Sequence, residues 1–210
     1  MSDIHGVSIL EARHNRLRIA LRANLGLAIA TFLFEAAELA GIFTVNADPE
    51  VDFTMFDWIY AFVAIAFLIV SIATIVLWCM WTNRAARNIV DSDLTAFSFT
   101  PGWAIGWYFI PIATWFKPFQ AMREIWNASV GEMGELSLPE PLLTKWWATW
   151  LISSILSNIS LRITMQAETA ETLYLATAIG AVASLASFIA IPIAIKMVAL
   201  VTEGQKLRFT

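Results

Sequence analysis

Four apolar stretches, each long or nearly long enough to cross a lipid bilayer, constrain this chain more than any other feature. They occupy residues 23–45, 58–81, 146–163 and 173–198. A helix needs about 20 apolar residues to cross the hydrocarbon core, and the third stretch is slightly shorter. The composition agrees, because 59% of the residues are hydrophobic and only 14% are charged. The sequence therefore predicts an all-α integral membrane bundle of about four transmembrane helices, in a single domain, 1–210.

The basic residues predict the orientation of these helices. If the N-terminus lies in the cytoplasm, 12 of the 13 Lys and Arg residues fall on the cytoplasmic side and only Arg162 lies near the other face. Positively charged loops tend to stay in the cytoplasm, so both termini and the connection 83–145 are predicted to be cytoplasmic. The segment 1–22 mixes apolar and basic residues. We expect it to be a helix that enters the membrane from its anionic inner surface.

The connection 83–145 contains an apolar, tryptophan-rich run at 101–116. As a helix this run would be about 24 Å long, which is short for a span. Crossing would also move Lys117 and Arg123 outside, against the charge rule. The run is therefore predicted to be re-entrant or to lie at the membrane interface, on the cytoplasmic side.

A helical period begins at Pro118, a residue type that suits the first turn of a helix. Phe119, Met122 and Trp126 then form one apolar stripe, while Arg123 faces elsewhere. This pattern predicts an amphipathic helix that lies on the membrane surface.

Two runs in this connection carry a family resemblance. They are Pro101-Gly102-Trp103-Ala104-Ile105-Gly106-Trp107-Tyr108-Phe109-Ile110-Pro111 and Lys117-Pro118-Phe119-Gln120-Ala121-Met122-Arg123-Glu124-Ile125-Trp126-Asn127-Ala128-Ser129. Together with Asn83-Arg84-Ala85-Ala86-Arg87-Asn88 and Trp146-Trp147-Ala148-Thr149-Trp150, they closely resemble the signature of a bacterial multi-pass membrane family catalogued as domain of unknown function number 4328. The resemblance covers about residues 55–200. It implies a protein of the bacterial inner membrane and supplies no activity, so no catalytic residues are carried over. Thr114-Trp115 stands where that family more often has Asn-Leu.

The sequence contains little that points to catalysis or to a cofactor. The only histidines, His5 and His14, precede the first apolar stretch, and no Cys or Asp cluster accompanies them, so a metal or haem site would lack ligands. A nucleophilic triad would also need a histidine placed beside its nucleophile. The basic residues are spread between helices rather than clustered, which argues against nucleic-acid binding. We therefore expect a non-enzymatic protein with no cofactor.

Four polar residues inside the apolar stretches predict a buried seam. Glu35 and Glu38 share one face of the first stretch, and Asn158 and Arg162 share one face of the third. At 1.5 Å per residue from the inner boundary, both pairs lie about 18–24 Å deep. Because an unpaired charge there costs at least about 3 kcal/mol, we expect Glu38 to pair with Arg162 and Glu35 to bond toward Asn158. The seam could fix which helices touch, carry protons or ions, or bind another subunit.

Two functions remain open at this stage. The first is an accessory or scaffold subunit of a larger membrane complex, which would dock another membrane protein, or a second copy of itself, through residues 101–126. The residues predicted to carry this docking are Pro101, Gly102, Trp103, Gly106, Trp107, Pro111, Lys117, Pro118, Phe119, Arg123 and Trp126. The alternative is a small ion or solute transporter or channel that uses Glu35 and Glu38. In both cases the lipid bilayer surrounds the chain.

The predicted topology can be tested by cysteine labelling in intact cells, in a chain whose Cys79 has been replaced. Single cysteines at Ser92 and Ser137 should resist a membrane-impermeant thiol reagent, because both lie in the cytoplasmic connection, whereas a cysteine at Asn46 should react. Labelling of the Ser137 position from outside would mean that the run 101–116 crosses the bilayer.

Overall fold

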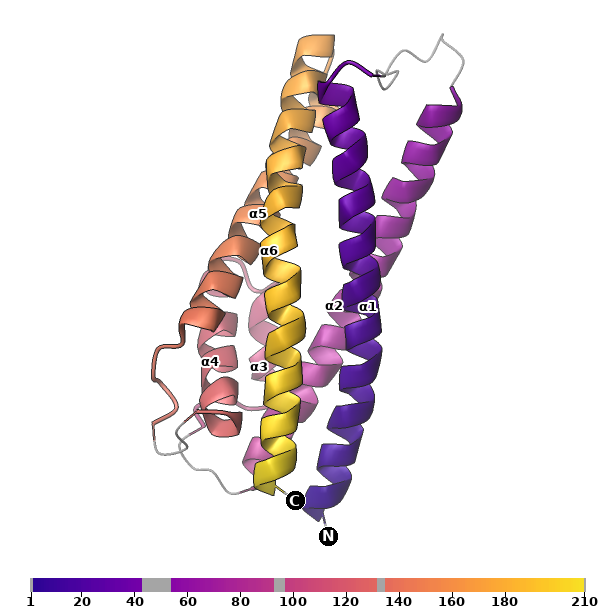
Figure 1. Cartoon of the computed structure of the whole chain (residues 1–210). Helices are drawn as coiled ribbons and strands as arrows, with labels where there is room; N and C mark the ends of the chain where they lie inside the picture. Colours follow the sequence, from indigo (N-terminus) through magenta and orange to yellow (C-terminus); the bar gives the residue numbers. More distant parts are fainter. Residues whose placement is uncertain (1, 43–53, 93–96, 132–134, 210) are drawn as a thin grey trace. The chain divides into compact units, whose positions relative to one another are not determined.

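The computed structural model describes residues 2–42, 54–92, 97–131 and 135–209, and every regular element in these ranges is a helix (Figure 1). Four helices are long: α1 (Ser2–Leu39), α2 (Met55–Asp91), α5 (Pro141–Gln166) and α6 (Ala170–Phe209). Between α2 and α5 lie four shorter ones: α3 (Trp103–Gly106), η1 (Trp107–Phe109), η2 (Ala113–Trp115) and α4 (Lys117–Ser129). The predicted all-α class is confirmed.

Local capping signals determine where α2 and α6 begin. At α2, Asp57 Oδ2 accepts the Thr54 backbone N–H at 2.8 Å, and Thr54 Oγ1 accepts the Asp57 N–H at 3.3 Å. This reciprocal pair satisfies backbone donors that have no partner within the helix. Thr169 and Thr172 form the same arrangement at α6, at 3.3 and 3.2 Å.

Helix α1 ends at a glycine. Gly41 adopts φ 71°, a conformation that costs glycine nothing, and the N–H of Ile42 bonds back to the Ala37 carbonyl at 3.0 Å. This is the common glycine termination of helices. It ends the helix earlier than the predicted span 23–45, whose last residues, 43–45, lie outside the described residues.

Three of the long helices, within the part of the chain that the structure describes, are long and apolar enough to cross a membrane: His5–Leu39 of α1, α2 and α6. The predicted spans 58–81 and 173–198 lie inside α2 and α6. Side chains of α2 such as Phe62 are largely uncovered by protein, and an apolar surface of that length needs lipid around it. The chain is therefore a membrane protein.

The remaining predicted span, 146–163, forms most of α5. This helix has 26 residues, which is long enough to span at 1.5 Å per residue. It is more polar than the other three, because it carries several serines together with Asn158 and Arg162. A count of four spans therefore stays a prediction.

The chain divides into two compact units. Unit 2 comprises Arg22–Ile72 and Ala148–Pro192. Aromatic rings join its helices: Phe32 packs edge-on against Phe188 with centroids 5.3 Å apart, and Phe34 lies 5.7 Å from Tyr60. Small polar groups join α5 to α6, since Ser153 and Ser187 share a hydrogen bond of 2.6 Å.

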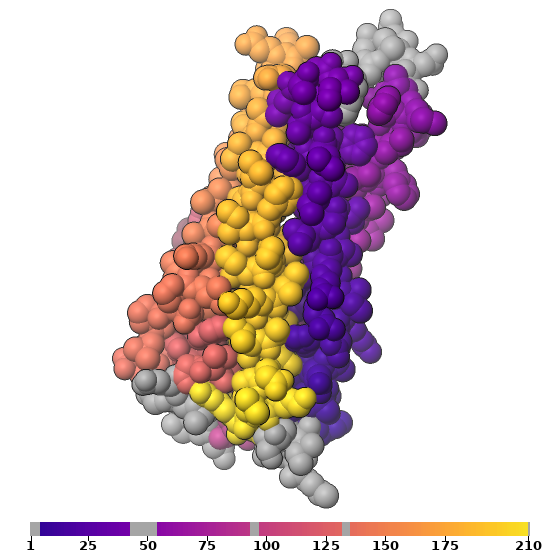
Figure 2. All heavy atoms as spheres, in the orientation of Figure 1, coloured from indigo at the N-terminus to yellow at the C-terminus, as the bar shows by residue number. Residues whose placement is uncertain are grey.

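Unit 1 comprises Met1–Leu21, Ala73–Trp147 and Ile193–Thr210, so it contains the predicted N-terminal helix and the tryptophan-rich connection. The first part of α1 and the last part of α6 lie side by side (Figure 2), with His14 Nδ1 3.2 Å from Thr202 Oγ1. Trp81 Nε1 of α2 donates to the same hydroxyl at 3.1 Å. The core of unit 1 contains large, fully buried side chains from five helices: Leu10, Leu17, Trp81, Ile89, Met122, Ile125, Leu143, Met197, Val198 and Val201.

Helix α4 corrects one prediction. It was expected to lie on the membrane surface, yet nine of its residues are buried, including Glu124 and Asn127 on its polar side. Small residues explain the difference, because Ala121 and Ala128 let neighbouring segments approach faces that carry no apolar stripe. Asn127 Nδ2 donates to the carbonyls of Leu136 and Leu138 at 2.9 and 3.0 Å. The helix is therefore an internal element of unit 1.

The contact between α6 and the end of α4 predicts an intolerant glycine. A Cβ added to Gly204 would lie 2.2 Å from the Ser129 carbonyl oxygen, a backbone atom. We expect Gly204→Ala to lower the free energy of unfolding by about 1–3 kcal/mol or more, as overpacking does.

Gly26→Ala is the matched control, because Gly26 is also helical and a Cβ there meets nothing within 4 Å. That variant should be neutral or more stable by up to about 1 kcal/mol. Thermal unfolding in one detergent compares the two. Equal stability of both variants would contradict the close contact at Gly204.

Candidate functional site

The Asn83–Asn88 motif of α2 has a structural role. Asn83 Nδ2 donates to the Pro101 carbonyl at 2.9 Å, which fixes the start of the tryptophan-rich run to α2. Ala85 and Ala86 are fully buried, and their small side chains allow close packing. The motif therefore positions other segments of unit 1.

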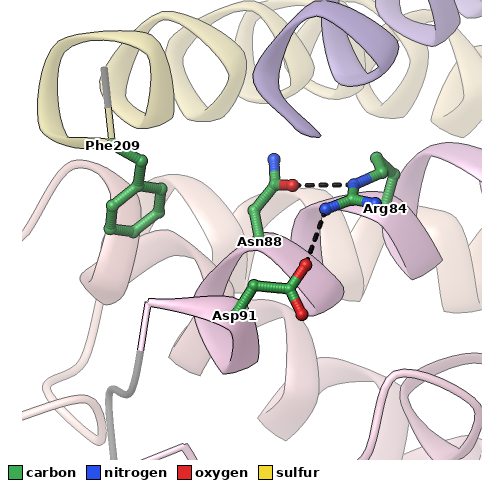
Figure 3. Close-up of a pocket in the computed structure, with 4 residues that line it drawn as sticks. All are labelled: Arg84, Asn88, Asp91 and Phe209. Carbon is green, nitrogen blue, oxygen red and sulfur yellow. Dashed lines mark hydrogen bonds and ion pairs between the residues drawn. The ribbon is translucent and has the colours of Figure 1, made fainter. Parts of the chain in front are cut away.

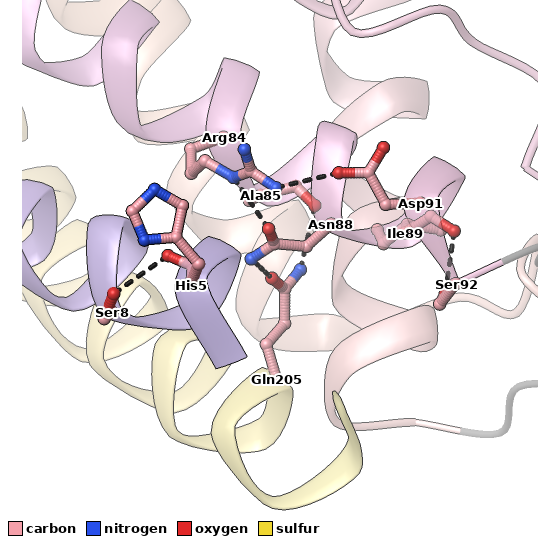
Figure 4. A network of polar contacts seen from close by, with 9 residues as sticks. All are labelled: His5, Ser8, Arg84, Ala85, Asn88, Ile89, Asp91, Ser92 and Gln205. Carbon is pink, nitrogen blue, oxygen red and sulfur yellow. Dashed lines mark hydrogen bonds and ion pairs between the residues drawn. The ribbon is translucent and has the colours of Figure 1, made fainter. Parts of the chain in front are cut away.

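A buried glutamine organises the polar contacts around this motif (Figure 4). Gln205 of α6 is fully buried. Its Nε2 donates to the Ala85 carbonyl at 3.0 Å, and its Oε1 accepts from Asn88 Nδ2 at 2.9 Å. The same Nε2 also donates to Ser129 Oγ at 3.1 Å. The amide thus uses both donor hydrogens and its oxygen, which is what a buried polar group requires.

A shallow pocket opens beside this network (Figure 3). It is lined by Arg84, Asn88, Asp91 and Phe209. The guanidinium of Arg84 is already engaged: Nε donates to Asn88 Oδ1 at 2.7 Å, and Nη2 pairs with Asp91 Oδ2 at 2.9 Å. These contacts use two of the five N–H donors of Arg84 and balance its charge with Asp91, so we assign no ligand to this pocket.

The tryptophan-rich run forms a hairpin, defined here as residues 101–116. Its first residue accepts the hydrogen bond from Asn83, and Tyr108 near its middle accepts a bond from Trp78 Nε1 of α2 at 3.1 Å. Burial raises the pKa of the Tyr108 hydroxyl above its ordinary value, so it stays protonated. Near the far end, Trp147 Nε1 of α5 donates to the Trp115 carbonyl at 3.1 Å. The hairpin is therefore tied to its neighbours at three points.

The hairpin does not contain a spanning helix. Helices α3, η1 and η2 have only four, three and three residues, far fewer than the roughly 20 that a span needs. Between η1 and η2, Ile112 adopts φ 69°, a conformation that is strained for a β-branched residue. Such strain persists only where the surroundings impose it, so the turn has a defined shape.

Large apolar side chains of the hairpin are exposed. Phe109, before the turn, is 70% exposed, and Ile112, within the turn, is 75% exposed. Trp103 is 51% exposed. Trp103 lies against Trp107, with ring centroids 4.8 Å apart. Lys117 Nζ lies 6.0 Å from the Trp107 ring centroid, at the limit of a cation–π contact. The exposed face is therefore apolar, with one cation at its edge.

The predicted docking residues divide into three groups in the structure. Gly102, Trp103 and Pro111 are exposed. Pro101, Gly106, Trp107, Lys117, Phe119 and Arg123 are half-buried. Pro118 and Trp126 are buried inside unit 1, so they cannot form part of an outer surface. Phe109 and Ile112 are exposed as well and were not among the predicted docking residues. The positive φ that accompanies the exposure of Ile112 is visible only in the structure.

The two intramembrane carboxylates bond to α6. Ser184 Oγ donates to Glu35 Oε2 at 2.9 Å, and Thr177 Oγ1 donates to Glu38 Oε2 at 3.2 Å. The two hydroxyls are seven residues apart, or about two helical turns, so they share one face of α6. Each carboxylate thus bonds to a hydroxyl group of α6 that was not among its predicted partners.

The polar pair of α5 does not join this contact. Asn158 Nδ2 donates to the Ser154 carbonyl of its own helix at 2.9 Å, and Arg162 is exposed. For Glu38 the structure describes the bond from Thr177, and the pair of Glu38 with Arg162 stays a prediction. Depth along a helix was predictable from the sequence, whereas the direction in which α5 faces was not.

The histidines take part in local contacts. His14 is buried against Thr202, and the His5 carbonyl accepts a bond from Ser8 Oγ at 2.8 Å. Among the residues that the structure describes, no three His, Cys, Asp or Glu side chains are grouped so as to hold a metal ion.

The glutamine network predicts a second stability difference. Gln205→Ala should lower the free energy of unfolding by about 2–3 kcal/mol, because it removes a fully buried side chain and strands the polar groups of Asn88 and Ser129. Lys206→Ala is the control, since that neighbour is exposed and its pair with Glu11 lies at the surface. Thermal unfolding of the purified chain measures both, and a Gln205→Ala variant as stable as the control would argue against the network.

The comparisons with known proteins identify a family and add no activity. No curated protein and no solved structure matches the chain significantly. The model of one family, described as Domain of unknown function (DUF4328), matches residues 46–203. This range includes the Asn83–Asn88 motif, the whole hairpin and α4, which are the segments that carry the resemblance in the sequence. The chain belongs to the DUF4328 family.

Proposed function

We propose that this chain is a non-enzymatic accessory or scaffold subunit of the bacterial inner membrane, with both termini in the cytoplasm. It docks another integral membrane protein through the exposed face of the hairpin, formed by Trp103, Phe109, Ile112 and Trp115. The observation that carries the proposal is that this face is apolar, exposed and held by hydrogen bonds at three points along the hairpin.

Rigidity distinguishes this surface from a simple lipid anchor. Hydrogen bonds from Asn83, Trp78 and Trp147 hold the hairpin at its start, middle and end. A surface that is already ordered loses little conformational freedom on binding, so more of its contact energy appears as affinity. A lipid anchor gains little from such order, because lipid tails adapt to any apolar shape.

The side chains on this face are of the kind that dominates binding energy. Tryptophan is enriched among the few interface residues whose truncation costs 2 kcal/mol or more. Trp103 and Trp115 are each about half exposed, so each already has one side packed and one side available. The indole of Trp126 is buried and is not part of the docking surface.

A second candidate function, transport of an ion or solute, is favoured by one observation. Glu35 is 8% exposed on an apolar helix and bonds to Ser184 of a second helix. Ionisable residues inside membrane spans are costly and often mark ion or proton paths. Flux into proteoliposomes that is lost in Glu35→Gln and retained in Trp103→Ala would favour transport over docking.

The docking proposal predicts a specific effect of two indoles. The variant carrying Trp103→Ala and Trp115→Ala should stay folded and lose a membrane protein that co-purifies with the unmodified chain in mild detergent. A loss of about 2 kcal/mol at one such residue corresponds to about thirtyfold weaker binding. Mass spectrometry of the purified complexes measures the ratio of partner to chain.

Trp58→Ala is the matched control, because Trp58 is 66% exposed but lies at the start of α2, in unit 2. It should retain the partner. If the unmodified chain brings down no membrane protein, or if both variants lose it equally, the docking proposal is overturned. Weaker membrane association of the hairpin without loss of a protein partner would instead indicate lipid anchoring.

A further inference from the structure

Glu35 lies deep in the membrane by two independent measures. Along α1 it is 12 residues beyond Ala23, the predicted inner boundary, or about 18 Å. Its partner Ser184 lies on α6, which begins at the other side of the membrane. Ser184 is 13 residues beyond Glu171, in the first turn of that helix, which corresponds to a depth of about 20 Å from that side. A hydrocarbon core is about 30 Å thick, so both helices place this carboxyl group well inside it.

The packing around Glu35 is close and comes from two other helices. A Cβ added to Gly180 of α6 would lie 2.7 Å from Glu35 Oε1 and 3.2 Å from Ser160 Oγ of α5. The carboxyl group therefore rests where α6 has no side chain. Its other oxygen, Oε2, accepts the bond from Ser184. Ser160 Oγ is committed to the Ala176 carbonyl at 2.8 Å.

These contacts leave a negative charge poorly compensated. The partners are hydroxyls, which stabilise an anion far less than a cation would, and the ion pairs within the described ranges do not include Glu35. A lone carboxylate in an apolar medium is costly enough that such a group takes up a proton instead.

We propose that the carboxyl group of Glu35, seated between Gly180 and Ser184, is a binding site for an exchangeable proton within the membrane. The other polar groups that face it from the packed helices are Glu38 of α1, Tyr60 of α2, Ser160 of α5 and Thr177 of α6. Proton binding at this site is independent of docking by the hairpin, which belongs to unit 1. Proton binding at Glu35 is also a step that proton transport through this residue would require.

Infrared spectroscopy of the full chain in lipid nanodiscs tests the proposal directly. At neutral pH the unmodified chain should show a carboxylic-acid C=O band that is absent in Glu35→Gln, shifts in D2O and disappears at high pH. Ser184→Ala removes a donor to the carboxylate, so the proton should be held about tenfold more tightly and the band should persist about one pH unit higher. Ser153→Ala, which removes a hydroxyl that bonds to Ser187 of α6 and not to Glu35, should leave the transition unchanged.

Three results would overturn the proposal. Identical C=O bands in the unmodified chain and in Glu35→Gln would mean that Glu35 is ionised. A band that responds neither to D2O nor to pH would mean that its proton does not exchange. Loss of the band on adding sodium or lithium ions at constant pH would mean that the site takes a metal cation. Because Ser184→Ala and Glu35→Gln change side chains conservatively, each variant should fold, and co-purification of the docking partner reports separately on the hairpin.

Discussion

Hydrogen bonds from side chains to backbone carbonyls position the hairpin within unit 1, and the shape of the hairpin depends on them. Helices of three or four residues have no cooperative stability of their own, so the hairpin needs anchors from outside. Asn83 and Trp147 supply them at its two ends. Arg208 does the same for α4, since its Nη1 donates to the Ala128 carbonyl at 3.0 Å, at a helix end whose last carbonyls have no partner within the helix.

These anchors explain why so much apolar surface can remain uncovered. A segment with exposed Phe109 and Ile112 would fold back onto any nearby apolar surface if it were free to do so. Its backbone is instead committed to α2 and α5, and the positive φ of Ile112 fixes the turn. The exposed side chains are therefore presented outward by the polar contacts behind them. The same argument gives the family motif a function: Asn83 acts through the hairpin that it holds.

The sequence predicted the features that follow from length, hydropathy and charge. The helices, the short broken run at 101–116 and the depth of Glu35 all follow from one-dimensional spacing. It could not predict which way a helix faces when two polar partners lie at equal depth, and so Glu35 was assigned to Asn158 instead of Ser184. It also could not predict the burial of α4, because an apolar stripe identifies one packed face, while Ala121 and Ala128 suit either a packed or an exposed face equally well.

The two buried polar centres, Gln205 and Glu35, differ in charge and in how completely their polar atoms are paired. Gln205 is neutral, and each of its donors and its acceptor has a partner, so burial leaves it nothing further to bind. Glu35 is an acid whose described hydrogen-bond partner is a single hydroxyl, and hydrogen bonding of that kind does not neutralise a charge. A proton neutralises this charge without requiring any further ligand atoms. The proposed proton exchange is therefore assigned to Glu35, whose charge has no cationic partner among the described ion pairs, and not to Gln205, which makes more polar contacts.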